Sequence, residues 1–225
     1  MREVSHPPYA GPPPGSPEQV SAILAEVRRL YPDAKISLTF SNPWELLVAT
    51  QLSAQSPDER VNRVTADLFQ KYRSVEDYAR ISQEELERDI QSLSFYHTKA
   101  MNIRATAQRI LTTYGGEMPH TMKDLLTLPG VARKTANVVL SNAFGIVEGI
   151  VVDTHVGRLA RRFGWTASKD EGKVEQDLMR IIPHKDWLDL PPLLIAHGHA
   201  ICRAHKPLCA QCTLILLCPS AFLVS

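Results

Sequence analysis

Apolar residues recur at helical spacing along most of this chain. Residues 16–19 (SPEQ) supply an N-cap serine, a proline at the first helical position and the glutamine of a capping box. The residues that follow place one apolar face on a helix with the 3.6-residue period: Val20, Ile23, Leu24, Val27 and Leu30. This pattern predicts an amphipathic helix with one buried side.

The same helix-opening pattern returns at residues 42–45 (NPWE), 56–59 (SPDE), 74–77 (SVED), 82–85 (SQEE) and 121–124 (TMKD). Gly115 is placed to end a helix whose apolar face holds Ala100, Ile103, Ala107, Ile110 and Leu111. Alternating strand patterns are confined to two short segments, residues 34–40 and 146–153. We therefore predict an all-α protein of about ten helices without a fixed-period repeat.

Length and composition are those of an ordinary globular protein. The chain has 225 residues, of which 44% are hydrophobic and 22% charged, enough for one large domain or two domains. There is no secretory signal pattern and no apolar run of about 18 residues, so we expect a cytoplasmic protein with no membrane partner. Residues 1–15 hold five prolines and no apolar period, and we expect a flexible Pro-rich arm.

The cysteines are clustered in one short segment. All four fall within residues 202–218, as Cys202-x6-Cys209-x2-Cys212-x5-Cys218. A disulfide framework usually joins distant segments, so this clustering indicates metal binding. One tight C-x2-C pair with longer arms favours a [4Fe–4S] cluster over zinc, because zinc ribbons usually carry two such pairs. A zinc site using His197, His199 and Cys202 is the alternative.

Charge is distributed unevenly, although the formal net charge is only +1. Binding of a polyanion must therefore depend on local patches. Residues 131–162 are mainly basic among their charged positions and form a candidate footprint for nucleic acid, whereas the acidic run at 76–89 fits a solvated helix face. Arg203 and Lys206 lie in the cysteine segment, where they either reach phosphates or keep a loop soluble.

Residues 121–145 predict a short helix, a tight Leu-Pro-Gly-Val turn and a second helix from about Arg133. A hairpin around Gly130 points the first N–H groups of the second helix outward, which suits a phosphate oxygen, although a plain helical hairpin has the same pattern. Lys134 lies in the first turn of that helix. We expect the helix macrodipole and partial burial to favour a neutral, nucleophilic amine; a lysine that extends to solvent is the more common arrangement.

Asp153 follows the apolar residues 150–152 and precedes an apolar-periodic helix. This position predicts an N-cap. A capping aspartate at the mouth of a cleft can also stabilise positive charge that develops on a sugar.

Three motifs occur here in the order found in the endonuclease III family of helix-hairpin-helix DNA glycosylases: LPGVARKTANVVL (128–140), VDTH (152–155) and the cysteine spacing. The sequence resembles that family from Ser16 to Cys218, including NPWELLVATQLSAQSPDERVN (42–62) and FYHTKAMNI (95–103). The resemblance implies two α-helical domains flanking a DNA-binding cleft. A six-helix barrel domain with the helix-hairpin-helix would span 36–146, and an iron-sulfur domain would join 16–35 to 147–225.

The resemblance also implies an activity: a bifunctional DNA glycosylase and AP lyase of base excision repair. Such an enzyme removes oxidised pyrimidines from duplex DNA and nicks the abasic strand by β-elimination through a lysine Schiff base. Lys134 stands at the position of the nucleophile and Asp153 at that of the catalytic aspartate. The [4Fe–4S] ligands would be Cys202, Cys209, Cys212 and Cys218. We expect a monomer whose partner is double-stranded DNA with damaged pyrimidines or abasic sites, associated with the nucleoid in a prokaryote.

The resemblance places a DNA contact at Gln55, which would fill the gap left by an extruded nucleotide; without it, Gln55 is a solvent-facing residue at a helix end. Further contacts are expected at Phe95, Tyr96, Gly130, Val131, Ala132, His155, Arg203 and Lys206.

The sequence departs from the family pattern at several positions. Ala132 replaces the second glycine of the usual Gly-Val-Gly turn, which would cost about 1 kcal/mol if that position needs a positive φ. Phe95 stands where many members have a leucine wedge, and it either stacks on bases or packs at a helix start. Leu126 stands where an acidic residue is common, and the segment between Lys134 and Asp153 is one residue longer than expected.

Two other functions fit part of the sequence. A monofunctional mismatch or adenine glycosylase would share the fold, but such relatives generally lack the lysine at position 134. A noncatalytic Fe–S DNA-binding protein would keep the hairpin and the cysteines but would need neither Lys134 nor Asp153.

Overall fold

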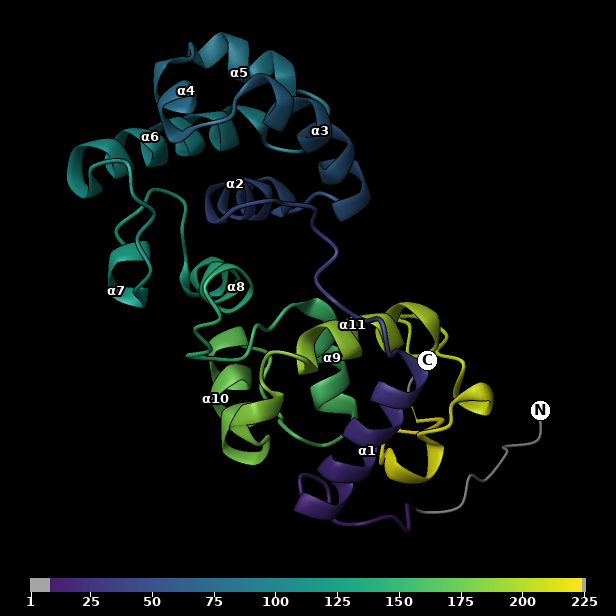
Figure 1. Cartoon of the computed structure of the whole chain (residues 1–225). Helices are drawn as coiled ribbons and strands as arrows, with labels where there is room; N and C mark the ends of the chain where they lie inside the picture. The colour runs from purple at the N-terminus through teal and green to yellow at the C-terminus, as the bar shows by residue number, and fades with distance from the viewer. Residues whose placement is uncertain (1–8, 224–225) are drawn as a thin grey trace. The chain divides into compact units, whose positions relative to one another are not determined.

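The structure, a computed structural model, describes residues 9–223, which form eleven α-helices and three short 3₁₀ helices. No strand occurs within residues 9–223 (Figure 1), so the all-α prediction is confirmed and both strand candidates are irregular segments. The helices are α1 (Pro17–Leu30), α2 (Pro43–Ser53), α3 (Asp58–Lys71), α4 (Val75–Arg80), α5 (Gln83–Ile90), α6 (Tyr96–Tyr114), α7 (Met122–Leu125), α8 (Arg133–Ala143), α9 (Thr154–Arg162), α10 (Glu171–Ile181), η1 (His184–Asp186), α11 (Leu190–Ala200), η2 (Cys209–Gln211) and η3 (Ile215–Leu217).

The chain forms two compact units. Unit 2 is Ile36–Glu148, and unit 1 joins Met1–Lys35 to Gly149–Ser225, of which residues 9–35 and 149–223 are described. Unit 2 is therefore continuous in sequence, whereas unit 1 needs both ends of the chain. Each unit has its own buried apolar residues.

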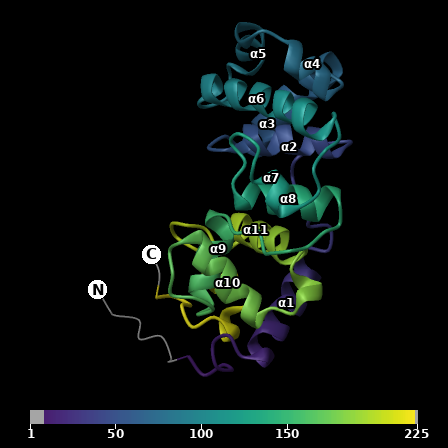
Figure 2. The ribbon, with the colours of Figure 1, turned by 90° about the vertical axis from the view of Figure 1, so that its left-hand side faces the viewer.

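Unit 2 is built around α2, which contacts α3, α6 and α8. The side chain of Asn42 accepts a hydrogen bond from the Glu45 N–H, and Pro43 occupies the first turn, so the sequence fixes where α2 begins. Its apolar residues are buried on nearly every side, as is typical of a central helix. Within this unit, α6 lies between α2 and the pair α4 and α5 (Figure 2).

Unit 1 packs α1 against α11, and α9 against α10 and α11. Buried Gln19 of α1 ties distant segments of this unit together. Its Nε2 donates to the carbonyls of Phe163 (3.1 Å) and Leu217 (2.8 Å), and its Oε1 accepts from Trp165 Nε1 (3.0 Å). A buried amide with all these partners satisfied fixes the N-terminal helix against the end of the cysteine segment.

Residues 9–15 were expected to belong to a flexible arm, and the structure corrects this. The Tyr9 hydroxyl donates to the Pro12 carbonyl (2.6 Å), and the Gly15 N–H donates to Gln19 Oε1 (2.7 Å). A Cβ on Gly164 would come within 2.7 Å of the Pro14 side chain, so the two backbones approach closely. These contacts hold residues 9–15 on unit 1; residues 1–8 of the expected arm lie outside the described residues.

The longest described helix is α6, with 19 residues. Polar and charged side chains recur along it, including Lys99 and Arg104. No helix in residues 9–223 combines the length and the apolar character needed to cross a membrane.

Candidate active site

The turn between α7 and α8 is held from two sides within unit 2. The Val131 N–H donates to the Leu128 carbonyl (3.2 Å), which closes the turn. The Pro129 carbonyl accepts from Gln51 Nε2 of α2 (2.8 Å) and from Thr106 Oγ1 of α6 (2.9 Å). Both donors are buried, so the hairpin is anchored to the two central helices of the unit.

Gly130 and Ala132 differ in their backbone conformation. Gly130 has φ +71°, and a Cβ there would lie 2.7 Å from Asn102 Nδ2 of α6, so both conformation and space require glycine. Ala132 is the N-cap of α8 with φ −94° and ψ 171°, an extended conformation that any residue adopts. The departure from the family's second glycine therefore carries no backbone strain. Val131, between them, is buried.

Lys134 is the second residue of α8 and its side chain is exposed. The expectation of a partly buried lysine is wrong: the apolar period continues through buried Val138, but the first turn of α8 extends beyond the core of unit 2. No side chain caps α8, because the N-cap residue is Ala132. Lys134 is therefore an accessible amine at the start of a helix that has no side-chain cap.

Asp153 caps α9 as predicted. Its Oδ1 accepts from the Val156 N–H at 2.7 Å, and its own backbone is extended. The side chain is half-buried. Asp153 belongs to unit 1, and Lys134 belongs to unit 2.

His155 lies in the first turn of α9 and stacks on His199 of α11, with ring centroids 4.2 Å apart. Arg158 Nη2 lies 3.2 Å from His155 Nδ1, and because a guanidinium can only donate, Nδ1 is the acceptor of this contact. Burial, more than any neighbouring charge, lowers the pKa of His155. Both rings lie at the surface of unit 1, where His155 is half-buried and His199 is exposed.

All four cysteines line one pocket in unit 1, and none of them forms a disulfide. Arg162 donates to the sulfur of Cys202 (3.1 Å) and to the carbonyl of Arg203 (2.7 Å), which fixes the start of the loop. Burial raises the pKa of Cys212, and it raises that of Cys218 to about 11. Within residues 9–223, no group of three or more His, Cys, Asp or Glu side chains is arranged to hold a single metal ion.

The histidines of the alternative zinc set are separated. His197 is buried, with Nε2 3.6 Å from the Cys212 sulfur and Nδ1 3.1 Å from the Tyr31 hydroxyl. His199 does not line the cysteine pocket and instead stacks on His155. The structure therefore does not bring His197, His199 and Cys202 together around one point. Arg203 and Lys206 are exposed on the loop.

Besides Gly130, left-handed backbone occurs at three of the residues predicted to contact DNA. Gln55, Phe95 and Lys206 have φ of 53°, 56° and 50°, although none of them is glycine or asparagine. Such a conformation costs roughly 1–3 kcal/mol and is typical of functional sites. Gln55 is exposed and Phe95 is 63% exposed. Tyr96 is half-buried, and its ring is tilted by 34° against the neighbouring His97 ring.

Sequence reasoning missed Lys99, which lies on the buried side of α6. Its side chain is 5% exposed, and its Nζ donates to the Leu52 carbonyl (2.7 Å) and to Ser56 Oγ (2.9 Å). Burial lowers the pKa of Lys99 to about 8. The available signal was its spacing four residues before buried Ile103, on a face that is otherwise apolar.

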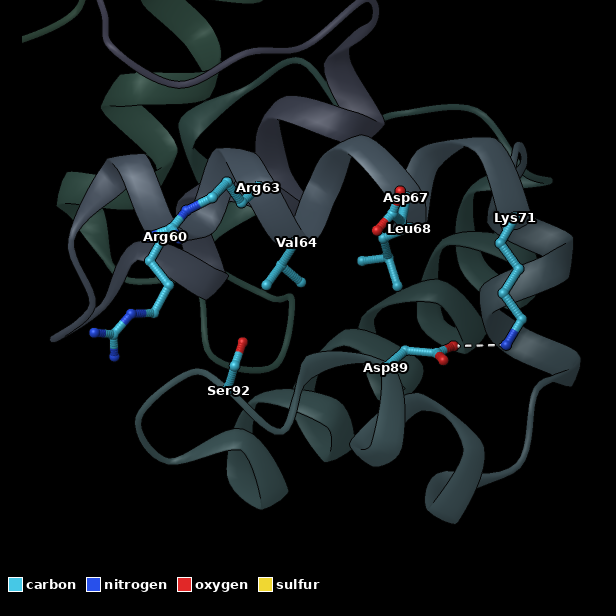
Figure 3. Close-up of a pocket in the computed structure, with 8 residues that line it drawn as sticks. All are labelled: Arg60, Arg63, Val64, Asp67, Leu68, Lys71, Asp89 and Ser92. Carbon is cyan, nitrogen blue, oxygen red and sulfur yellow. Dashed lines mark hydrogen bonds and ion pairs between the residues drawn. The ribbon is translucent and has the colours of Figure 1, made fainter.

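An open groove lies elsewhere in unit 2, between α3 and the end of α5 (Figure 3). It has a volume of about 540 Å³ and is lined by Arg60, Arg63, Val64, Asp67, Leu68, Lys71, Asp89 and Ser92. At one end Lys71 Nζ pairs with Asp89 Oδ2 at 2.8 Å. None of the predicted site residues lines this groove.

Comparison with known proteins identifies the class. Residues 48–184 match the HhH-GPD superfamily, described as base excision DNA repair proteins. Endonuclease III of Synechocystis sp. is 50% identical over 91% of this chain and 93% of that protein, and endonuclease III of Bacillus subtilis is 47% identical over 89% and 92%. A solved trapped covalent intermediate of endonuclease III with DNA aligns with TM-score 0.87 and 43% identity, covering 92% of this chain and 98% of that one.

The chain is thus a base excision DNA repair protein of the HhH-GPD superfamily. Within that superfamily it belongs to the endonuclease III family. The family and enzyme class predicted from the sequence, a DNA glycosylase with AP lyase activity, are confirmed.

We expect Gly130→Ala to destabilise unit 2 by about 2–3 kcal/mol, because alanine disfavours positive φ and its Cβ displaces Asn102. Gly115→Ala is the matched control: its φ is +62°, but no atom lies within 4 Å of the added Cβ, so only the backbone cost of about 1 kcal/mol applies. Urea unfolding of both variants measures the difference. Equal losses would contradict the packing role assigned to Gly130.

Proposed function

We propose that this enzyme excises oxidised pyrimidines from duplex DNA and cuts the abasic strand through a Schiff base on Lys134. The observation that carries the proposal is an accessible lysine amine at the uncapped start of α8, directly after an anchored turn. A covalent endonuclease III–DNA intermediate exists for a relative 43% identical to this chain, which requires a nucleophile in that relative. Lys134 is the amine at the matching hairpin motif of this chain.

The reaction begins with extrusion of the damaged nucleotide, since its C1′ cannot be attacked within the stack. The neutral amine of Lys134 forms a bond to C1′, and the bond from C1′ to the base breaks, so the electron pair leaves with the base. Asp153 offsets the positive charge that develops on the sugar. One carboxylate oxygen of Asp153 accepts from the Val156 N–H, and a carboxylate has a second oxygen that can face the sugar.

Strand scission follows from the same adduct. Ring opening gives an iminium between Lys134 and C1′, which makes the C2′ proton acidic. Loss of that proton breaks the bond between C3′ and its phosphate oxygen, and water then releases the lysine from the sugar. These steps need no oxidant and no nucleophile other than Lys134 and water.

DNA contacts are proposed from exposed backbone and side chains. The turn Gly130-Val131-Ala132 and the first N–H groups of α8 suit a phosphate oxygen. The space left by the extruded nucleotide would be filled or wedged by Gln55, Phe95 and Tyr96. The DNA backbone would be contacted by His155, Arg203 and Lys206. Left-handed conformation at Gln55, Phe95 and Lys206 supports these assignments.

We propose a [4Fe–4S] cluster on Cys202, Cys209, Cys212 and Cys218. The fit rests on four thiols, none in a disulfide, that line one pocket, with Arg162 donating to one sulfur. A cluster is larger than a single ion, so its thiolates surround a pocket and do not converge on one point. When bound, it supplies four iron–thiolate bonds that fix the loop carrying Arg203 and Lys206.

We propose that a monomer acts on double-stranded DNA, in the nucleoid if the source is prokaryotic. Among the alternatives, the monofunctional glycosylase is disfavoured because Lys134 is present. The noncatalytic binding protein is disfavoured because it would need neither Lys134 nor Asp153, and both are present.

The proposal is tested by borohydride reduction with a duplex that contains dihydrothymine. The wild-type chain should give a covalent adduct, and Lys134→Gln should reduce it to background because the amide cannot form a Schiff base. Lys123→Gln is the matched control, since it removes an exposed lysine from the other helix of the hairpin. An adduct that persists in Lys134→Gln would assign the nucleophile to another residue.

Asp153→Asn should separate catalysis from capping. Asparagine caps helices as well as aspartate does, so the thermal unfolding midpoint should stay close to wild type, while excision should fall about 100- to 1,000-fold with loss of the charge. Asp153→Ala should in addition lose about 1 kcal/mol of stability. Full excision activity in Asp153→Asn would exclude the electrostatic role.

The purified chain should contain iron and acid-labile sulfide in equal amounts, with no stoichiometric zinc. Cys209→Ser should lower both contents and the unfolding temperature, because cluster ligation contributes to folding of the loop. His199→Ala, as control, should leave both contents unchanged. Zinc in place of iron, lost in His199→Ala, would support the histidine-containing site instead.

A further inference from the structure

The Lys99 ammonium is buried, and no carboxylate within residues 9–223 forms an ion pair with it. Its side chain is 5% exposed, and burial lowers its pKa to about 8, so the charged form still predominates at neutral pH. Burying a cation is unfavourable unless strong hydrogen-bond acceptors compensate. The reaction described above does not use this group.

The acceptors of Lys99 belong to the segment that follows α2. Its Nζ donates to the carbonyl of Leu52, in the last turn of α2, where the helix macrodipole favours a cation. The same Nζ donates to Ser56 Oγ at 2.9 Å. The Ser94 N–H donates to that hydroxyl oxygen as well, at 3.2 Å. The Ser56 hydroxyl therefore joins residues 54–57, which connect α2 to α3, with residues 91–95, which connect α5 to α6, and the Lys99 ammonium holds this hydroxyl against the end of α2.

In each of these two connections, the residue next to the hydrogen-bonded serine has a strained backbone. Gln55 precedes Ser56 and has φ 53°; Phe95 follows Ser94 and has φ 56°. A non-glycine residue holds this conformation only when its surroundings enforce it. The Phe95 carbonyl also accepts from the Lys99 N–H at 3.0 Å, so Lys99 contacts both connections through its backbone and its side chain.

We propose that Lys99 is a positioning residue that holds Gln55 and Phe95 together in the conformation with which they enter the duplex. The inference rests on the proposed function, in which Gln55 and Phe95 occupy the space left by the extruded nucleotide. Lys99 acts through Ser56 and Ser94 and does not touch the substrate. Its loss should impair extrusion from a paired duplex and spare the chemistry of the Schiff base.

Two substrates separate these steps. A duplex containing dihydrothymine requires extrusion, whereas a single-stranded oligonucleotide with an abasic site has no opposite strand and no base to remove. Lys99→Met keeps the length of the side chain and removes the charge and its hydrogen bonds. We expect excision from the duplex to fall about 10- to 100-fold, because small misplacements of positioning groups have effects of that size. Borohydride trapping on the single strand should stay within about twofold of wild type.

A second variant probes the network without removing the ammonium. Ser56→Ala deletes the hydroxyl that Lys99 and Ser94 share, and it should reduce duplex excision in the same direction. If Lys99 acts through Ser56, the double variant should lose less than the product of the two single losses. Lys71→Met is the control: it removes an exposed lysine from the far end of α3, paired there with Asp89, and should leave both substrates unaffected.

A direct readout of positioning is a fluorescent adenine analogue placed opposite the lesion. Wild-type enzyme should unstack it on binding, and Lys99→Met should reduce this signal at saturating protein. Thermal unfolding of each variant accompanies the assays; if Lys99→Met does not fold, Ser56→Ala decides the question.

Wild-type excision of dihydrothymine in both Lys99→Met and Ser56→Ala would overturn the inference. Equal loss on the duplex and on the single strand would also overturn it, because that pattern indicates general disruption of the active site. Failure of the proposed function gives a different result: wild-type enzyme would then neither excise dihydrothymine nor form an adduct with either substrate.

Discussion

An α-helix leaves its first N–H groups and its last C=O groups without hydrogen-bond partners inside the helix. The helices of this chain differ in which groups supply the missing partners. Most helix starts are capped by a local side chain, such as Asn42 at α2 and Asp153 at α9. The starts of α3, α6, α8 and α11 have no side-chain cap, and at α8 the N-cap residue is Ala132. The start of α8 is the one that carries Lys134 and the proposed phosphate contact.

Hydrogen bonds at helix ends also position the proposed site residues of unit 2. The carbonyl of Pro129 is fixed by Gln51 and Thr106, so the hairpin turn is as rigid as the two helices that hold it. The last turn of α2 is satisfied by the Lys99 ammonium. Exposed residues with a strained backbone thus lie on buried, hydrogen-bonded supports, which keeps the cost of reorganisation low when a substrate arrives.

The sequence predicts the helices and their caps well because capping and apolar period are local properties. Asp153 is one example, since a short side chain after an apolar run has few other roles. The exposure of Lys134 was not predictable from period alone: the buried face of α8 includes Val138, but the position of the first turn depends on where the core of unit 2 ends. The order in residues 9–15 was missed because it depends on Gln19 and Gly164, which lie far away in sequence or offer no apolar signal.

Other features were hidden because the residue types are misleading. Gln55 and Phe95 give no sign of positive φ, which sequence patterns associate with glycine and asparagine. Lys99 was missed because a helical lysine usually extends to water. The separation of His199 from the cysteine pocket follows from its neighbours on α9, a tertiary contact that spacing in one segment cannot reveal.

The discontinuous make-up of unit 1 has a consequence for biosynthesis. Unit 2 is complete once residue 148 has left the ribosome, so its non-local contacts can form during translation. Helix α1, in contrast, must wait for partners at the other end of the chain, because Gln19 bonds the carbonyl of Leu217. The apolar face of α1 stays partly uncovered until α11 and η3 have been synthesised, so nascent chains that stall before that point expose it to chaperones or to aggregation.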